Sequence, residues 1–289
     1  MRLALGTAQF GLPYGIANST GQIIRSDAVE ILHLASGMGM DTLDTAIAYG
    51  ESEKMLGEVG VRGWRVVSKL PGIPGECSDY AGWVRESLEG SLRRLDLSSL
   101  YGVLFHKPVE LLQAGGDRLF HKLQQLKRDG VIQKIGVSIY DPAELDLLVK
   151  RFQFDLVQAP FSILDRRLIE TGWLPRFAEQ GIELHVRSVF LQGLLLMRPT
   201  ERPDKFSRWN QLWFEWGDWL RANNLTPLQA CLRYALSFPE INRVVVGVDS
   251  SGHLRELASA AAGGIPEISD KFLIRDRELL NPANWGALA

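Results

Sequence analysis

The chain has 289 residues, of which 46% are hydrophobic and 23% are charged, so it can bury a large core and carries too much charge for a membrane-embedded protein. Its 32 Lys and Arg residues are balanced by 34 Asp and Glu residues, which excludes the basic excess of a nucleic-acid-binding protein. Its two cysteines are too few for a disulfide framework, and the sequence shows neither a signal-peptide pattern nor an apolar run that could span a bilayer. We therefore expect a cytoplasmic globular enzyme that binds neither nucleic acid nor membrane.

Short apolar runs, typical of β-strands, recur along the whole chain. Most are rich in Val, Leu and Ile, as strands covered on both faces are. The predicted strands cover residues 3–7, 40–44, 65–69, 100–105, 133–138, 154–158, 182–188 and 242–247.

Helical patterns fill most of the intervals between these strands. Ser26 and Asp27 are capping candidates for the first helix. Pro142 and Pro227 stand where proline begins a helix, and Gly130 follows a helix that it can end. The predicted helices cover residues 80–95, 118–129, 167–180 and 250–262, and three more begin near residues 26, 142 and 227.

This alternation of strand and helix predicts a (β/α)8 TIM barrel in a single domain, with the active site at the carboxyl ends of the strands. A doubly wound sheet also alternates, but it usually stops at about five or six strands and carries a glycine fingerprint, and no GxGxxG motif follows any strand here. Residues 198–224 form a Trp-rich insertion after the seventh strand, whose tryptophans either line the site or pack a helix. Residues 265–289 form a C-terminal extension that can fold back over the barrel, with Trp285 as an anchor.

Four polar residues lie at or just after the carboxyl ends of three consecutive strands, namely Asp44, Tyr49, Lys69 and His106. A lysine at the end of a buried strand needs a carboxylate partner or gives up its proton, and Asp44 can supply that partner. The resulting cation can hydrogen-bond the phenol of Tyr49 and lower its pKa, which suits a general acid. His106 can orient a substrate carbonyl. Each residue alone also has a structural interpretation, such as a helix cap, but together they indicate a site that protonates a carbonyl oxygen.

Longer motifs surround these residues, among them LALGTAQFG, DTLDTAIAYGESEKMLG, VVSKL, VLFHKP and TPLQACLRYALSFPEINRVVVGVDS. With them the chain resembles the aldo-keto reductase family from residue 3 to about residue 257. The resemblance implies that Tyr49 is the general acid and that His106 orients the substrate. It implies that Asp44 and Lys69 form the ion pair that tunes the tyrosine. It further implies hydride transfer from a nicotinamide cofactor lying across the barrel mouth, with no metal and no Rossmann fold.

The resemblance also places the cofactor. Ser138 and Gln158 match residues that hold the carboxamide in similar proteins, while the alternative for Gln158 and Ser188 is ordinary hydrogen bonding at the end of the barrel. Arg187 stands where relatives often have an aromatic residue under the nicotinamide ring; either its guanidinium stacks there or the ring is held otherwise. The full set of expected cofactor-binding residues is Gly6, Thr7, Asp44, Ser138, Gln158, Arg187, Ser188, Phe190, Gln192, Gly193, Gly247, Asp249, Ser250 and His253.

The residues after the eighth strand leave the choice of cofactor open. Relatives commonly place a Lys or Arg there, against the 2′-phosphate of NADPH. Asp249 would repel a phosphate, whereas Ser250 at the helix N-terminus and Arg255 could attract one. In the alternative, Asp249 and Ser250 only cap the helix. The family resemblance favours NADPH, and NADH is the alternative.

The resemblance predicts an enzyme that reduces an aldehyde, a ketone or a sugar carbonyl, or that oxidises the corresponding alcohol. Phe10 and Tyr14, after the first strand, are expected to border the substrate together with His106. Two other functions fit part of the pattern: a Schiff-base aldolase acting through Lys69, and a nucleotide-binding subunit without activity of its own. The expected partner is a small carbonyl compound or sugar, and the expected oligomeric state is a monomer or a small homo-oligomer.

Overall fold

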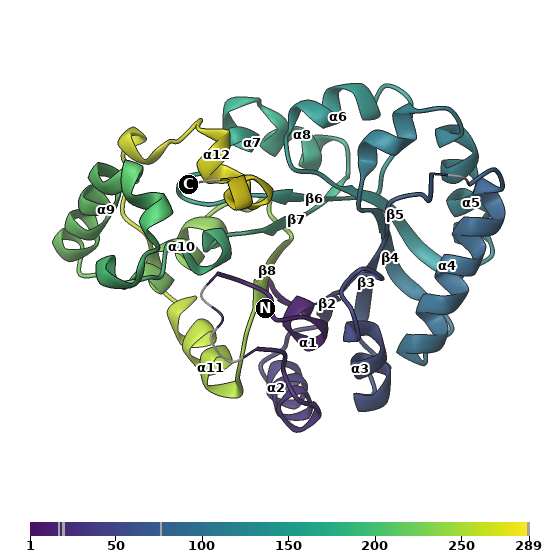
Figure 1. Ribbon diagram of the computed structural model, residues 1–289, viewed down its shortest axis with the longest axis horizontal. Helices are drawn as coiled ribbons and strands as arrows, with labels where there is room; N and C mark the ends of the chain where they lie inside the picture. The colour runs from purple at the N-terminus through teal and green to yellow at the C-terminus, as the bar shows by residue number, and fades with distance from the viewer. Residues whose placement is uncertain (17, 19–20, 76, 288–289) are drawn as a thin grey trace.

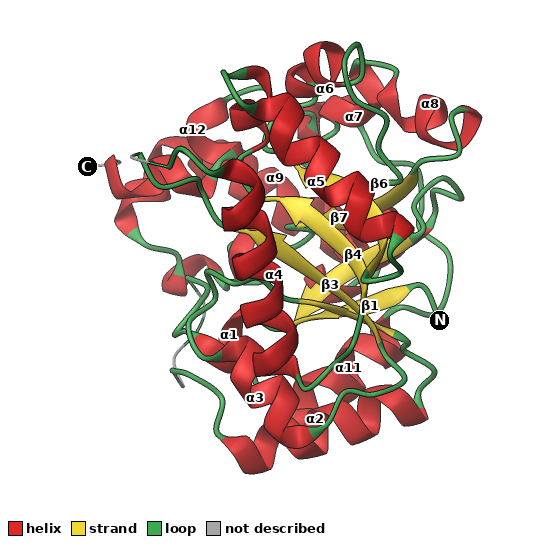
Figure 2. Cartoon of the chain, turned by 90° about the vertical axis from the view of Figure 1, so that its right-hand side faces the viewer, coloured by secondary structure: helices red, strands yellow, loops and turns green. Residues whose placement is uncertain are grey.

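Eight parallel strands close into a barrel in the order in which they occur along the chain, and the last strand pairs with the first. The computed structural model describes residues 1–16, 18, 21–75 and 77–287. Helices surround the barrel, and the strands lie inside the ring that they form (Figure 1 and Figure 2). The predicted (β/α)8 barrel is confirmed. Among the helices of the described residues, none combines the length and the hydropathy needed to cross a membrane.

All the predicted strands are present, with ends shifted by one or two residues. After β1 the chain leaves the barrel at Thr7, whose amide and hydroxyl both donate to the carbonyl oxygen of Asp44, at 2.9 and 3.0 Å. The strands are β1 (Leu3–Gly6), β2 (Thr42–Asp44), β3 (Arg65–Leu70), β4 (Leu100–Phe105), β5 (Ile132–Ser138), β6 (Leu156–Pro160), β7 (Glu183–Arg187) and β8 (Arg243–Gly247).

The predicted helix starts are met in part. Helix α10 begins at Pro227, as the sequence predicted, and the hydroxyl of Thr226 caps it by accepting from the Gln229 amide at 3.2 Å. The N-cap of α2, by contrast, is Ile24, so Ser26 and Asp27 lie in its first turn. The helices are α1 (Ala8–Gly11), α2 (Arg25–Gly37), α3 (Ser52–Val59), α4 (Tyr80–Leu95), α5 (Gly116–Arg128), α6 (Ala143–Leu148), α7 (Arg167–Glu170), α8 (Trp173–Glu179), α9 (Asn210–Ala222), α10 (Pro227–Leu236), α11 (Ser251–Ala260) and α12 (Arg277–Leu280).

Glycine explains two of the differences between the predicted and the observed helices. Helix α3 was not predicted, since Gly57 interrupts its pattern. The structure requires glycine there, because a Cβ at this position would lie 2.0 Å from the carbonyl oxygen of Arg94 in α4. The single helix expected over residues 167–180 is two helices, α7 and α8, because Gly172 between them adopts a left-handed conformation with φ of 71°.

The Trp-rich insertion packs against the C-terminal extension. Trp216 of α9 is buried and meets Phe272 edge-on, with ring centroids 5.8 Å apart. Phe206 meets Trp285 in the same way, at 4.9 Å. The extension therefore folds back onto the insertion, and its residues 288–289 lie outside the described ones. These aromatic rings pack in the core. Of the two alternatives that the sequence left for the tryptophans of the insertion, the structure therefore shows packing of a helix.

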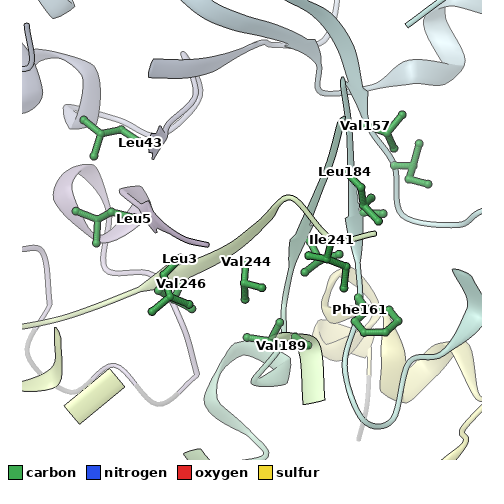
Figure 3. Close-up of a cluster of buried hydrophobic side chains, with 14 of the residues drawn as sticks. Leu3, Leu5, Leu43, Val157, Phe161, Leu184, Val189, Ile241, Val244 and Val246 are labelled. Carbon is green, nitrogen blue, oxygen red and sulfur yellow. The ribbon is translucent and has the colours of Figure 1, made fainter. Parts of the chain in front are cut away.

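Alternate residues of each strand face two different parts of the core. Val157 belongs to the large core between strands and helices, part of which Figure 3 shows. Its neighbour Leu156 packs with Val67 and Leu104 in a small cluster inside the barrel. Burying each of these side chains contributes about 1.5–3 kcal/mol. Because both faces of a strand are covered, most strands are rich in apolar residues, as in β1 and β4.

Candidate active site

The same alternation brings polar side chains inside the barrel at the carboxyl ends of the strands. In β3 the inward-facing Val67 is followed two residues later by Lys69, and in β6 Leu156 is followed in the same way by Gln158. The side chains that reach the site from strand ends are Asp44, Lys69, Ser138, Gln158 and Arg187.

Lys69 and Asp44 form a buried ion pair. The Lys69 Nζ lies 2.8 Å from each carboxylate oxygen of Asp44 and 2.8 Å from the carbonyl oxygen of Thr45. The ammonium group is thus bound by a carboxylate and by a backbone carbonyl. The Lys69 side chain is completely buried, so burial lowers its pKa, while the charge of Asp44 opposes this shift. The partner that the sequence predicted for Lys69 is therefore present.

Buried polar groups support Asp44 from the far side of the barrel. The Gln158 Nε2 donates to Asp44 Oδ1 at 2.5 Å, and the Gln158 Oε1 accepts from the Ser138 hydroxyl at 3.1 Å. Gln158 and Ser138 are 0% and 1% exposed. Here they support the carboxylate of the ion pair, which is the kind of hydrogen bonding at the end of the barrel that the sequence left as an alternative for Gln158. The carboxamide contact of Ser138 and Gln158 stays a prediction.

Tyr49 lies in the loop between β2 and α3, beside the ion pair. The Lys69 Nζ lies over the ring, 5.0 Å from its centroid, and the His106 ring meets it nearly edge-on with centroids 5.9 Å apart. The loop comes this close to α1 because residue 11 is glycine, where a Cβ would lie 1.8 Å from the Tyr49 carbonyl oxygen. The structure thus brings together Asp44, Tyr49, Lys69 and His106, called the four-residue group below.

Burial dominates the acid–base properties of the two rings. Burial, and then the negative charge of Asp44, raise the pKa of Tyr49 far above its usual value. Burial and the positive charge of Lys69 lower the pKa of His106 from 6.5 to about 4. At neutral pH the phenol therefore keeps its proton and the imidazole is uncharged. The sequence predicted that Lys69 would lower the pKa of Tyr49; in the structure the pKa is raised instead, chiefly because the phenol is buried.

A cavity of about 320 Å³ lies at the carboxyl ends of β1, β2, β7 and β8 and extends to α11. Its size falls within the roughly 300–1,000 Å³ of small-molecule sites. Tyr14 and Tyr49 border it, as do most of the residues expected to bind the cofactor. These are Gly6, Thr7, Asp44, Arg187, Ser188, Phe190, Gln192, Gly193, Gly247, Asp249 and His253.

Some expected site residues lie away from this cavity. Phe10 is fully buried in the core, which differs from the expectation that it borders the substrate. Ser250 caps α11, since its hydroxyl accepts from the His253 amide at 3.2 Å. The tryptophans of the insertion do not border the cavity either. Sequence reasoning missed Glu256, which does border it; its spacing of three residues from His253 on one helix face was the available signal.

The loop after β7 has an unusual backbone. Ser188, Leu191 and Gln192 have positive φ angles of 61°, 49° and 52°, which residues other than glycine rarely adopt. Such conformations cost about 1–3 kcal/mol each and cluster at ligand sites. Because Ser188 and Gln192 both border the cavity, we expect ligand contacts along this loop.

Acidic groups gather at the α11 end of the cavity. Asp249 and Glu256 both border it, and the Oδ1 atom of Asp249 is buried with no hydrogen-bond partner among the described residues. The other oxygen of Asp249 lies 3.7 Å from His253 Nδ1. Arg255, which could have attracted a phosphate, lies outside the cavity border and 3.6 Å from Glu30. This end therefore offers an acceptor that suits a hydroxyl group better than a phosphate.

These features fit a nicotinamide dinucleotide. Gly247 and Gln9 both border the cavity and lie close together. A Cβ at position 247 would lie 2.4 Å from the Gln9 amide nitrogen, so a larger residue would displace the Gln9 side chain. The Asp249 carboxylate and the turned loop after β7 lie at separate places on the border. Within the described residues, no group of three or more His, Cys, Asp or Glu side chains is placed to hold a metal ion.

Comparison with known proteins gives a family and several relatives. The model of the Aldo/keto reductase family matches residues 2–271. The oxidoreductase YqkF of Bacillus subtilis is 27% identical over 263 residues, which cover 82% of this chain and 83% of that protein. The NADH-specific methylglyoxal reductase of Escherichia coli is 26% identical over 267 residues, which cover 83% of this chain and 80% of that enzyme.

Solved structures share the fold. An aldo-keto reductase from Bacillus halodurans superposes with a TM-score of 0.73 at 20% identity, and the match covers 96% of this chain and 90% of that one. The glycerol dehydrogenase of Gluconobacter oxydans gives a TM-score of 0.69 at 21% identity, over 94% of this chain and 88% of that one.

Proposed function

The chain belongs to the aldo/keto reductase family, and on this basis we propose that it transfers a hydride between a nicotinamide cofactor and a small aldehyde, ketone or sugar. The family and its oxidoreductase relatives support a general oxidoreductase role. The observation that carries the finer proposal is the buried Asp44–Lys69 pair, set beside Tyr49 at the edge of the cavity.

Tyr49 supplies the proton in the proposed reaction. Its raised pKa keeps the phenol protonated at neutral pH, so it can donate to the carbonyl oxygen while that carbonyl is reduced. The cofactor, when bound, supplies the hydride. In the reverse direction the Tyr49 phenolate accepts the proton of the alcohol. His106, uncharged because its pKa is about 4, orients the substrate oxygen by a hydrogen bond.

We propose that NADH is used at least as well as NADPH, although the family resemblance favours NADPH. The Asp249 carboxylate borders the cavity and can accept a hydrogen bond from the 2′-hydroxyl of the adenosine ribose. A phosphate in its place would face the carboxylates of Asp249 and Glu256, and two unit charges 4 Å apart repel by about 4 kcal/mol at an effective dielectric constant of 20. The E. coli relative is described as NADH-specific, which agrees with this proposal.

The geometry argues against a Schiff-base aldolase. Such an enzyme needs a lysine amine that is free to attack a carbonyl carbon. The Lys69 amine is completely buried, and its protons are bound by Asp44 and Thr45. Borohydride added in the presence of a carbonyl substrate should therefore leave Lys69 unmodified.

A panel of aldehydes, ketones and sugars, assayed with NADH and with NADPH, tests the proposed function. The absorbance of the reduced cofactor reports turnover directly. We expect turnover of at least one carbonyl compound, with kcat/KM for NADH equal to or above that for NADPH. Tight binding of both cofactors without turnover of any compound would contradict the proposal and favour a nucleotide-binding subunit.

A further inference from the structure

A second cavity, of about 530 Å³, lies at the end of the barrel opposite the candidate active site. Its border includes Leu3 at the start of β1, Leu236 at the end of α10 and Gly263 just after α11. In a barrel of parallel strands the starts of the strands lie away from the active-site end, and no described residue borders both cavities. A cavity of this size can hold a small molecule.

The border of the second cavity is positively charged. Arg2 and Arg233 both belong to it, whereas no Asp or Glu of the described part of the chain does. All the hydrogen bonds that these two guanidinium groups donate to described residues go to backbone carbonyl oxygens. No carboxylate of those residues therefore neutralises either arginine, and a ligand in the cavity meets two positive charges.

Arg233 is fixed at the end of α11. Its Nε donates to the Ala260 carbonyl oxygen at 3.1 Å, and its Nη1 donates to that of Gly264 at 3.4 Å. Gly263 has a φ angle of 108°, and a Cβ there would lie 3.0 Å from the Arg233 Cζ, so glycine lets this turn lie against the guanidinium. The Arg233 Nη2 donates to no described residue, which leaves it available to a ligand.

Arg2 is fixed at the end of α10. Its Nη1 donates to the carbonyl oxygens of Phe238 and Ile241 at 2.7 and 3.1 Å, and its Nη2 donates to that of Leu236. The Nε atom has no acceptor among the described residues. Because three acceptors already hold this side chain, little of its freedom remains to be lost when a ligand binds.

Both arginines also cap helices, since a positive group at a helix C-terminus meets the last carbonyl groups. The helix dipole places only about half an elementary charge at each end, so it balances the charge of an arginine only in part. Capping alone also does not require that the two arginines border one cavity. Both features follow if the cavity takes an anion.

We propose that the second cavity binds a small organic anion whose phosphate or carboxylate group meets Arg2 and Arg233. The planar guanidinium matches both groups, because it can donate two parallel hydrogen bonds to them. The border also includes the apolar side chains of Leu3, Leu236 and Ile265, which suit the carbon skeleton of such a ligand. This binding site is separate from the active-site cavity and does not depend on the proposed function.

NMR titration of the protein at one low ionic strength tests the proposal. Phenyl phosphate and benzoate are the anionic probes, and benzyl alcohol is the neutral control. The amide signals of Gly263 and Gly264 report on the second cavity, and those of Gly193 and Gly247 report on the active-site cavity. We expect at least one anion to shift the first pair saturably, with a dissociation constant in the millimolar range or tighter.

Two results of this titration would overturn the proposal. One is that neither anion shifts the signals of Gly263 and Gly264 saturably, including the case in which only Gly193 and Gly247 respond. The other is that benzyl alcohol binds as tightly as the anions, because charge would then have no part in binding.

Removal of one positive charge is the second test. We expect Arg233→Met to weaken binding of the anion at least about tenfold, since a charged hydrogen-bond donor is lost. Arg221→Met, which removes an exposed arginine paired with Asp218 in α9, is the matched control and should leave the affinity unchanged. A lower urea denaturation midpoint in Arg233→Met with unchanged affinity would mean that Arg233 only caps α11, and would contradict the proposal.

A variant at an exposed position keeps the test valid if Arg233→Met fails to fold. Ala262 is exposed and borders the second cavity, so a substitution there leaves both caps in place. The carboxylate of Ala262→Glu competes with the anion and should weaken its binding at least about tenfold, whereas Ala262→Gln has the same size without the charge and should bind as the wild type does. Equal affinities in the two variants would overturn the proposal.

Discussion

Lys69 and Asp44 neutralise each other inside the barrel, and this pairing sets the energetics of the site. A buried ion whose partner is removed cannot recover its hydration, so the loss is much larger than at the surface. We expect Asp44→Asn to lower the free energy of unfolding by about 3–5 kcal/mol, measured by urea denaturation. The double variant Asp44→Asn, Lys69→Met removes both charges and should recover part of that loss. A single variant as stable as the wild type would show that the pair is not formed.

Asp249 determines the cofactor preference in the proposed function. We expect Asp249→Lys to shift the ratio of kcat/KM for NADPH and NADH toward NADPH by about 1 kcal/mol or more, because the new ammonium can meet the 2′-phosphate with a charge-assisted contact. Asp249→Asn, which only removes the repulsion, should shift the ratio less. Both are measured at one ionic strength, since salt screens the effect. A wild-type preference for NADPH above a thousandfold would mean that Asp249 does not face the phosphate.

At the scale of elements, two glycines explain helices that the sequence did not predict correctly. The strands were predictable because most of them are covered on both faces and are rich in apolar residues. Helix α3 was not, since the reason for Gly57 lies in a different helix, at the carbonyl oxygen of Arg94. Gly172 likewise divides α7 from α8 through a backbone angle that no periodicity reveals.

Two helical glycines therefore make a matched pair. A Gly→Ala change inside a helix, where the new methyl group meets no obstacle, usually stabilises by up to about 1 kcal/mol. We expect Gly217→Ala in α9 to follow this rule, because its Cβ would meet only the Arg221 guanidinium, at 3.6 Å. Gly57→Ala should instead destabilise the protein, since its Cβ would collide with backbone at 2.0 Å. Equal urea denaturation midpoints for the two variants would contradict this account of α3.

At the scale of the whole molecule, the barrel and the four-residue group were predictable together. Parallel strands align their carboxyl ends, so residues at those ends meet even when they are far apart in sequence. The hydrogen bond from Gln158 to Asp44 was not predictable, because it depends on side-chain directions across the barrel. The packing of Trp216 on Phe272 likewise depends on how the C-terminal extension folds back.

The stability of the whole protein should depend on pH through His106. The unfolded histidine takes up a proton near pH 6.5, whereas the folded one does so only near pH 4. Because the unfolded state binds more protons between these values, the free energy of unfolding falls as the pH drops through this range. In His106→Asn, urea denaturation should show a smaller fall over the same range. An identical fall in both proteins would mean that other groups cause it.

The measurement that tests the central claim most directly is the turnover of Tyr49→Phe. The change removes the phenol hydroxyl and keeps the ring that packs beside His106. We predict that kcat for carbonyl reduction falls by at least about two orders of magnitude, within the usual contribution of a general acid, while cofactor binding measured by fluorescence is unchanged. A Tyr49→Phe protein that keeps more than about a tenth of the wild-type kcat would contradict the assignment of Tyr49 as the proton donor.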